Sequence, residues 1–340
     1  MIKKNWLLLS LAIGLIAFGI GLRPQQVLAA DDAGFTVKTV LPANQRDTSQ
    51  TYFDLRVSPN QGQDLEVVIQ NRNTAPLTVL LAAHSAFTND NGVVEYGKSP
   101  KPADPTLPVN LQEIVTLPAE VTIPALSQQT VKIHLKMPAK PFSGTVLGGL
   151  QFKAKSDDKG NEKGAVTNRY VYAVGLMLSE SDQPVVPDLK LRQVAADNDH
   201  GQPAILANIQ NFEAAILRNL HVSGYLYRQS GGKALYRSEK TRINMAPNSN
   251  FNFKLNLGKG PLEPGKYRLK LVAKGGGRTW NLTRTFTVSK KDADKLRELS
   301  KPDTPAASIP WYLILIGGIV LGISLYAVFK KIQSIRRHKR

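Results

Sequence analysis

A glycine-rich stretch is the first place where residue types and spacing suggest chemistry. The segment "MPAKPFSGTVLGGLQF", residues 137–152, places Gly144, Gly148 and Gly149 between apolar residues. A phosphate-cradling loop needs a Lys and a Ser or Thr after its last glycine, and a dinucleotide-binding turn needs a helix to follow. Here Leu150 and Gln151 follow Gly149, so no Lys stands at the required place, and the next residues form a short alternating run and then a polar loop. We therefore interpret the glycines as structural, because glycine lets another backbone or a bulge come close to a strand.

Other candidates for chemistry are weaker. The segment "TNDNG" at 88–92 resembles part of a calcium loop but lacks a third acidic ligand and a closing Glu, so Asn91-Gly92 predicts a hairpin turn instead. The five histidines are scattered, and neither H-E-x-x-H nor G-x-S-x-G occurs. A catalytic triad assembled from distant residues stays an open alternative without support. We expect no catalytic residues, no metal and no cofactor, and the chain is predicted not to be an enzyme.

The elements that would position any site are short strands. Apolar runs with a period of two recur at roughly ten-residue spacing, which favours an all-β fold of two tandem immunoglobulin-like β-sandwich domains. We expect the first at residues 31–156 and the second at 166–290, with the polar loop 155–168 as the boundary. In this interpretation "GTVLGGLQF" is the last strand of the first sandwich and "RYVYAVGLML" the first strand of the second. Each half also contains a strand that ends in "IQN", at 69–71 and 209–211.

Both ends of the chain carry membrane-targeting patterns. Residues 1–30 combine two lysines, an apolar core and a small-residue cleavage site, which is typical of a secretory signal peptide. Residues 309–329 are uncharged and long enough for one transmembrane helix, and six basic residues follow in the tail 330–340. The positive-inside rule predicts a cytoplasmic tail, a juxtamembrane linker at 291–308, and a single-pass membrane protein with its N-terminus and ectodomain outside, facing the cell wall. No L-P-x-T-G sortase signal precedes the apolar run.

The net charge of +18 is unevenly distributed along the chain. Nine of the 44 Lys and Arg residues lie at 1–30 and 309–340, and these two segments contain no acidic residue. The rest of the chain contains the remaining 35 basic residues and all 26 acidic residues. Residues 31–178 are neutral, with 14 of each sign, so the excess lies at 179–308, with 21 basic and 12 acidic residues. Such a surface suits anionic wall polymers or an acidic protein, or is merely solvated. We expect no nucleic acid as partner, because no aromatic-rich nucleic-acid motif accompanies the charge.

An ordered set of motifs resembles the WxL-interacting proteins of Gram-positive bacteria. The segments that carry the resemblance are "LPANQ", "YFDLRVSPNQGQDLEVVIQN", "AFTNDNGVVEYG", "MPAKPFSGTVLGGLQF", "YVYAVGLML", "AILANIQNFEAAILRNLHV", "MAPNSNFNFKL" and "GKYRLKLVAKGGGRTWNLTRTFTV". The resemblance implies that the first domain binds peptidoglycan and the second binds WxL-domain surface proteins. It implies a membrane-anchored adaptor that holds a noncovalent complex at the cell surface. The alternatives are a wall-processing enzyme, which would need paired carboxylates or a metal, and a pilus-type chaperone, which would be soluble.

One strand of the second half is a candidate docking surface for the protein partner. In "LHVSGYLYR", Tyr225 and Tyr227 share a face with His221 and Ser223, because side chains of a strand alternate. Tyrosine is frequent at interface centres. The alternative is that both rings pack into the core of their own domain.

Overall fold

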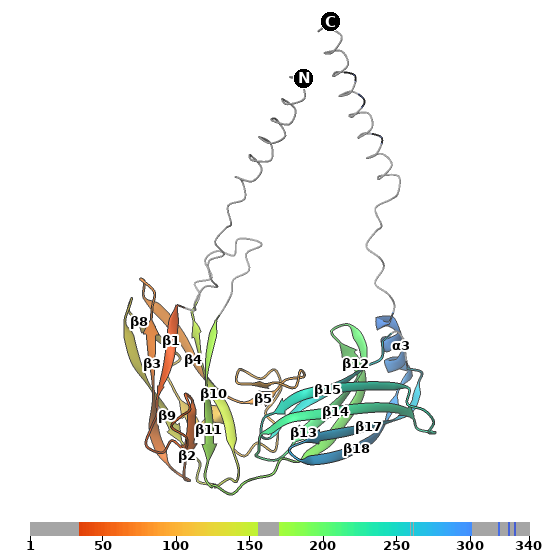
Figure 1. The fold of residues 1–340 in the computed structure, drawn as a ribbon, viewed down its shortest axis with the longest axis horizontal. Helices are drawn as coiled ribbons and strands as arrows, with labels where there is room; N and C mark the ends of the chain where they lie inside the picture. The colour runs from red at the N-terminus through yellow and green to blue at the C-terminus, as the bar shows by residue number, and fades with distance from the viewer. Residues whose placement is uncertain are drawn as a thin grey trace, which may run out of the picture.

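The computed structural model describes residues 34–155, 170–258, 260, 262–300 and three single positions, 319, 326 and 330. The described residues form mainly β-strands, which confirms the predicted all-β class (Figure 1). The predicted signal peptide, and the predicted transmembrane segment and tail apart from those three positions, lie outside the described residues, as does 301–308. Across the described ranges, no helix has the length and apolar character needed to span a bilayer.

The first sandwich is built from two sheets that enclose one buried cluster. The first sheet has the order β1-β3-β9-β7, and the second has the order β2-β11-β10-β4-β8. The core between them includes Phe35, Phe53, Leu65, Ile133 and Phe152. The strands are β1 (Phe35–Val40), β2 (Phe53–Arg56), β3 (Gly62–Asn71), β4 (Leu77–Ser85), β7 (Val115–Thr116), β8 (Glu120–Ile123), β9 (Gln128–Lys136), β10 (Val146–Ala154) and β11 (Val171–Ser179), with one short helix α2 (Leu111–Ile114) between β6 (described below) and β7.

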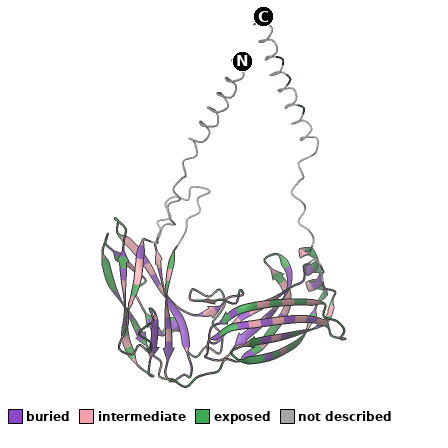
Figure 2. Ribbon diagram, viewed as in Figure 1, coloured by how far each residue is buried: buried purple, intermediate pink, exposed green. Residues whose placement is uncertain are grey.

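The alternation of residue types explains these strands. In β9, "QQTVKIHLK", Val131, Ile133 and Leu135 are buried while the residues between them are exposed. The same two-residue period runs along both sandwiches as alternating buried and exposed positions (Figure 2). Full burial of one such side chain contributes about 1.5–3 kcal/mol, so register is fixed wherever one face meets the core.

Strand β11 belongs to the first sandwich. Its sequence was expected to open the second sandwich, but it pairs antiparallel with β10 from Val171 to Leu178 and parallel with β2 from Leu176 to Ser179. Its inward residues Val174, Leu176 and Leu178 complete the first core. The polar loop 155–168 therefore joins two neighbouring strands of one sheet, β10 is not the last strand of the first sandwich, and the second begins after Ser179.

The second sandwich is likewise a pair of sheets around its own core. Sheets β12-β13-β16 and β15-β14-β17-β18 enclose a cluster that includes Ile205, Phe251, Leu269 and Trp280. The strands are β12 (Leu189–Asp199), β13 (Gln202–Asn211), β14 (Leu217–Arg228), β15 (Tyr236–Met245), β16 (Ser249–Asn256), β17 (Gly265–Gly275) and β18 (Arg278–Val288).

A helix replaces part of the predicted linker at 291–308. Helix α3 (Lys290–Leu299) begins at a capping box in which Ser289 and Asp292 satisfy each other's backbone amides. Its buried residues Ala293 and Leu296 join the second core. This part of the segment is therefore a docked element of the second sandwich, because two apolar residues three apart place a small apolar face against β12 and β13.

The tripeptide "IQN", which ends one strand in each half of the chain, has an equivalent structure in both sandwiches. Asn71 ends β3 and Asn211 ends β13, and both side chains are buried. The amide of Asn71 donates to the carbonyl of Ala75 at 2.9 Å, and the amide of Asn211 donates to that of Ala215 at 2.7 Å. Each asparagine thus closes the turn that follows its strand.

A hairpin from the first sandwich reaches the second. Strands β5 (Phe87–Thr88) and β6 (Val94–Glu95) are joined by the predicted Asn91-Gly92 turn, in which the Gly92 amide donates to the carbonyl of Asn89 at 2.8 Å. Figure 1 shows this hairpin between the two sandwiches. The hydroxyls of Thr88 and Ser249 lie 2.6 Å apart, and the Asn244 amide donates to the Gly92 carbonyl at 2.8 Å.

Candidate functional site

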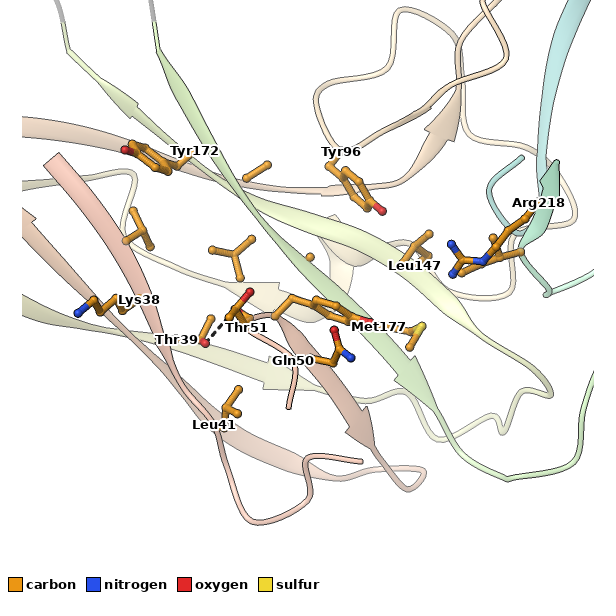
Figure 3. A pocket seen from close by; sticks show the side chains of 16 residues that line it. Lys38, Thr39, Leu41, Gln50, Thr51, Tyr96, Leu147, Tyr172, Met177 and Arg218 are labelled. Atoms are coloured by element: carbon orange, nitrogen blue, oxygen red, sulfur yellow. Dashed lines mark hydrogen bonds between the residues drawn. The ribbon is translucent and has the colours of Figure 1, made fainter. Parts of the chain in front are cut away.

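A groove of about 770 Å³ lies on the first sandwich where it meets the second (Figure 3). Its walls come from β1, the segment before β2, the β5–β6 hairpin and β11, and Ile216 and Arg218 of the second sandwich close one end. This volume is within the range that binds small ligands or short segments of polymers.

The groove exists because β2 covers only half of β11. The two strands pair from Leu176 to Ser179, whereas residues 171–175 have no partner on that side among the described residues. Strand β1, which comes near β11, pairs instead with β3 of the opposite sheet. The space between β1 and the first half of β11 is therefore left open.

Two glycines set the depth of the groove on the outer face of the sheet. Gly149 of β10 pairs directly with Gly175 of β11. A Cβ atom added at Gly149 would lie 2.7 Å from the Cβ atom of Tyr96, and one added at Gly175 would lie 3.5 Å from that of Tyr52. Close approach is thus what the glycines of this strand provide, which confirms their structural interpretation from the sequence. Added Cβ atoms at Gly148 and Gly144 would likewise collide with the carbonyl oxygens of His84 and Ala214.

Three tyrosines supply the aromatic surface of the groove. Tyr52 and Tyr96 are half-buried, and Tyr172 packs edge-on against Phe35 with ring centroids 4.9 Å apart. Burial raises the pKa of Tyr96, although nearby Arg218 acts in the opposite direction. The phenol of Tyr96 therefore stays protonated at neutral pH and can donate a hydrogen bond.

The charges of the groove have one sign. Lys38 and Arg218 lie toward opposite ends in Figure 3, and no Asp or Glu lines the groove. Neither cation forms an ion pair with another residue that the structure describes. The hydroxyl of Thr39 donates to the carbonyl of Thr51 at 3.1 Å, which ties β1 to the segment before β2.

Sequence reasoning missed this groove. Its tyrosines come from three separate segments, and Arg218 comes from the other sandwich. Only the glycines of β10 pointed to it, since they marked a strand that another segment approaches. The segment that approaches this strand is the hairpin with Tyr96. Its identity depends on long-range packing, which the local sequence pattern does not show.

The predicted docking residues Tyr225 and Tyr227 lie on a second surface. Both are half-buried on the outer face of β14, while Val222 and Leu226 point into the core. The alternative that the two rings fill their own core is therefore wrong. The guanidinium groups of Arg237 and Arg268 lie 5.5 Å from the ring centroids of Tyr225 and Tyr227, respectively.

The predicted neighbours of these tyrosines share the same face. His221 Nε2 lies 2.6 Å from Glu239 Oε1 and 3.4 Å from the hydroxyl of Ser223. Exposed basic residues of β17 stand beside them in register: Tyr225 pairs with Lys270, and His221 pairs with Lys274. The excess positive charge of the second half is thus concentrated in part on a flat sheet face.

Among the described residues, no group of three or more His, Asp or Glu residues is arranged to hold a metal ion.

Comparisons with known proteins match both halves of the chain to one family. Residues 35–154 match the model of the WxL Interacting Protein peptidoglycan binding domain, and residues 161–298 match that of the WxL Interacting Protein host binding domain. No curated protein matches the chain. Among solved structures, the class 5 fimbriae chaperone CfaA is 13% identical over 74% of this chain and 98% of its own, with a TM-score of 0.28. The CsuC–CsuE chaperone–tip adhesion subunit complex of Acinetobacter baumannii pili is 13% identical over 73% and 97%, with a TM-score of 0.33.

Proposed function

We propose, from the premise that the chain belongs to the WxL-interacting protein family, that it is a non-enzymatic adaptor which holds a protein complex against the Gram-positive cell wall. The two matched domain types make it a cell-wall binding adaptor with one peptidoglycan-binding and one host-binding domain. The proposal adds a signal peptide, a single membrane anchor, an ectodomain of two immunoglobulin-like sandwiches that faces the wall, and a WxL-domain protein as partner.

The groove is the proposed peptidoglycan site. The observation that carries this assignment is that Tyr52 and Tyr96, which flank the open half of β11, both belong to the segment matched by the peptidoglycan-binding model, while β11 and Arg218 on the other side of the groove belong to the segment matched by the host-binding model. Tyrosine rings give flat apolar contact with a polar end, which suits a polymer of sugars and short peptides.

The outer face of the sheet β15-β14-β17-β18 is the proposed docking surface for the protein partner. Tyr225 and Tyr227 provide aromatic area, and the arginines beside them provide positive charge. The resemblance implied that a WxL-domain protein binds here, whereas the family model that matches this half of the chain is described as a host binding domain. We propose the WxL-domain protein as occupant, and a host protein is the other outcome of the test.

A reciprocal pair of variants tests both assignments. The purified full-length chain is sedimented with purified sacculi and, separately, mixed with a purified WxL-domain protein. Tyr52→Ala is expected to lower sacculus binding about tenfold and to leave partner binding unchanged. Tyr225→Ala is expected to do the opposite. Unchanged sacculus binding by a folded Tyr52→Ala variant would remove the groove as the wall site, and a chain that never sediments with sacculi would contradict the proposed function itself.

A further inference from the structure

The open half of β11 is an unprotected strand edge. Residues 171–175, "VYAVG", contain neither Lys nor Pro, and Tyr170 and Val171 are 37% and 46% exposed. Native sheets block exposed edges with charges, prolines, bulges or covering segments, because free N–H and C=O groups recruit other strands. No described strand pairs with this edge. A strand-like ligand is what such an edge accepts.

The direction of the free backbone groups follows from the neighbouring pairs. The Ser179 carbonyl accepts from the Val57 amide at 3.1 Å, so Ser179 points its backbone groups toward the β2 side. Since backbone direction alternates along a strand, Val171, Ala173 and Gly175 point their N–H and C=O groups to that same open side. At about 3.3 Å per residue the open edge is about 13 Å long, enough for a peptide of about four to five residues.

The charge of the groove selects among such peptides. Lys38 and Arg218 stand toward its two ends without acidic partners among the described residues, so an extended peptide with carboxylates is complementary to it. Peptidoglycan has two parts that present different chemical groups to a binding site. Its glycan strands present mainly hydroxyl groups, whereas its short peptide arms present a row of amides and free carboxylates. Only the peptide arm matches both the strand edge and the two cations.

We propose that the groove binds the peptide arm of peptidoglycan, in extended form, as an added strand on Val171, Ala173 and Gly175. This inference rests on the proposed wall-binding function and names the part of the polymer that is bound. Lys38 and Arg218 pair with carboxylates of the peptide, and the tyrosines flank it. Because Arg218 belongs to the second sandwich, the bound peptide contacts both domains.

Separated glycan strands and peptide arms distinguish this inference from the function it rests on. The full-length chain is sedimented with intact sacculi in the presence of one of two soluble competitors, the glycan strands or the peptide arms that an amidase releases from sacculi. Intact sacculi are expected to bind, and the peptide arms are expected to compete at least about tenfold more strongly than the glycan strands. Equal competition by both would overturn the peptide assignment while leaving the wall-binding function in place. Absence of binding to intact sacculi would overturn both.

Charge and backbone variants locate the contact. A free stem peptide is titrated into the chain, and Arg218→Gln or Lys38→Gln is expected to weaken its binding about tenfold, as for loss of a charge-assisted hydrogen bond. The matched controls Arg242→Gln and Lys140→Gln remove exposed cations outside the groove and are expected to change nothing. A stem peptide with N-methylated backbone amides is expected to lose binding, because it cannot pair with the edge. Full binding of the methylated peptide, or equal effects of controls and groove variants, would refute the added-strand geometry.

Discussion

At the residue scale, the pair Gly149 and Gly175 shows how one missing methyl group shapes a site. The two residues face each other across β10 and β11, but only Gly149 lies directly under the Cβ atom of Tyr96. We expect Gly149→Ala to lower the free energy of unfolding by about 1–3 kcal/mol, because Tyr96 and its hairpin must shift. The matched variant Gly175→Ala meets Tyr52 at an ordinary 3.5 Å and should cost under about 1 kcal/mol. Urea unfolding of both variants checks the difference, and equal losses would contradict it.

Asp90 links acid sensitivity to the junction between the sandwiches. It accepts from the backbone amide of Asn252 at 2.9 Å and from Lys101 Nζ at 2.7 Å. Burial alone would raise the pKa of Asp90, but the bonds from Lys101 and Asn252 outweigh burial and hold the pKa below its usual 3.8. A carboxyl with a lowered folded-state pKa contributes stability above its unfolded-state pKa and loses it as the pH falls through the folded-state value.

The Asp90 contribution is measurable by comparing unfolding at about pH 6 and about pH 3. The wild-type chain should lose more stability over this interval than Asp90→Asn, whose amide does not titrate there. Asp294→Asn, a change at an exposed position of α3, serves as control and should keep the wild-type loss. If Asp90→Asn loses as much as the wild type, the ionised Asp90 does not stabilise the junction.

At the element scale, the strand pattern was predictable because burial alternates along the strands of both sandwiches, as in β9 and β16. The sandwich to which β11 belongs was not predictable, since "VYAVGLML" alternates equally well for either core and the choice is made by pairing with distant β2. Helix α3 was missed for a similar reason. Only two of its residues are buried, so its periodicity is weak until β12 and β13 are in place to receive them.

The outer face of β14 is the docking surface that was predicted from the alternation of side chains along the strand. The double change Tyr225→Ala and Tyr227→Ala removes two half-buried rings and their contacts with Arg237 and Arg268. We expect binding of the WxL-domain partner to weaken by more than about 2 kcal/mol, the range of interface hot spots. The rings lie outside the core, so the unfolding transition should be retained. Wild-type affinity in a folded double variant would exclude this face as the docking surface.

At the scale of the whole molecule, membrane orientation is the prediction that rests on the sequence alone. The basic tail 330–340 is expected inside the cell and the two sandwiches outside. Protease added to intact protoplasts should remove the sandwiches and leave a small membrane-bound fragment. A tag placed at Arg340 would identify that fragment, and a chain that is fully protected until the membrane is permeabilised would reverse the orientation.

The two sandwiches are joined by buried polar groups that no local sequence pattern indicated. Asp104 follows the hairpin in the first half of the chain, yet its side chain is only 2% exposed. It accepts from Gln210 Nε2 at 2.5 Å and from Asn250 Nδ2 at 2.6 Å, both of the second sandwich. Asn248 Nδ2 donates to the Thr106 carbonyl at 2.9 Å beside it. Because the groove takes residues from both sandwiches, this junction also holds Arg218 in position at the groove.

Replacing Asp104 should uncouple the sandwiches. Asp104→Asn presents an amide to side chains that already donate, so we expect the chain to lose about 2–4 kcal/mol of unfolding free energy, as for a buried charge network that loses one partner. Calorimetry should show one transition for the wild type and two for the variant, since each sandwich keeps its own core. Asp64→Asn, an exposed change within the first sandwich, should cost less than about 1 kcal/mol and keep one transition. If Asp104→Asn also unfolds in one undiminished transition, Asp104 does not couple the two sandwiches, and the position of Arg218 depends on the hairpin contacts of Thr88, Asp90 and Gly92 and on the apolar contact of Ala86, Leu147 and Ala246.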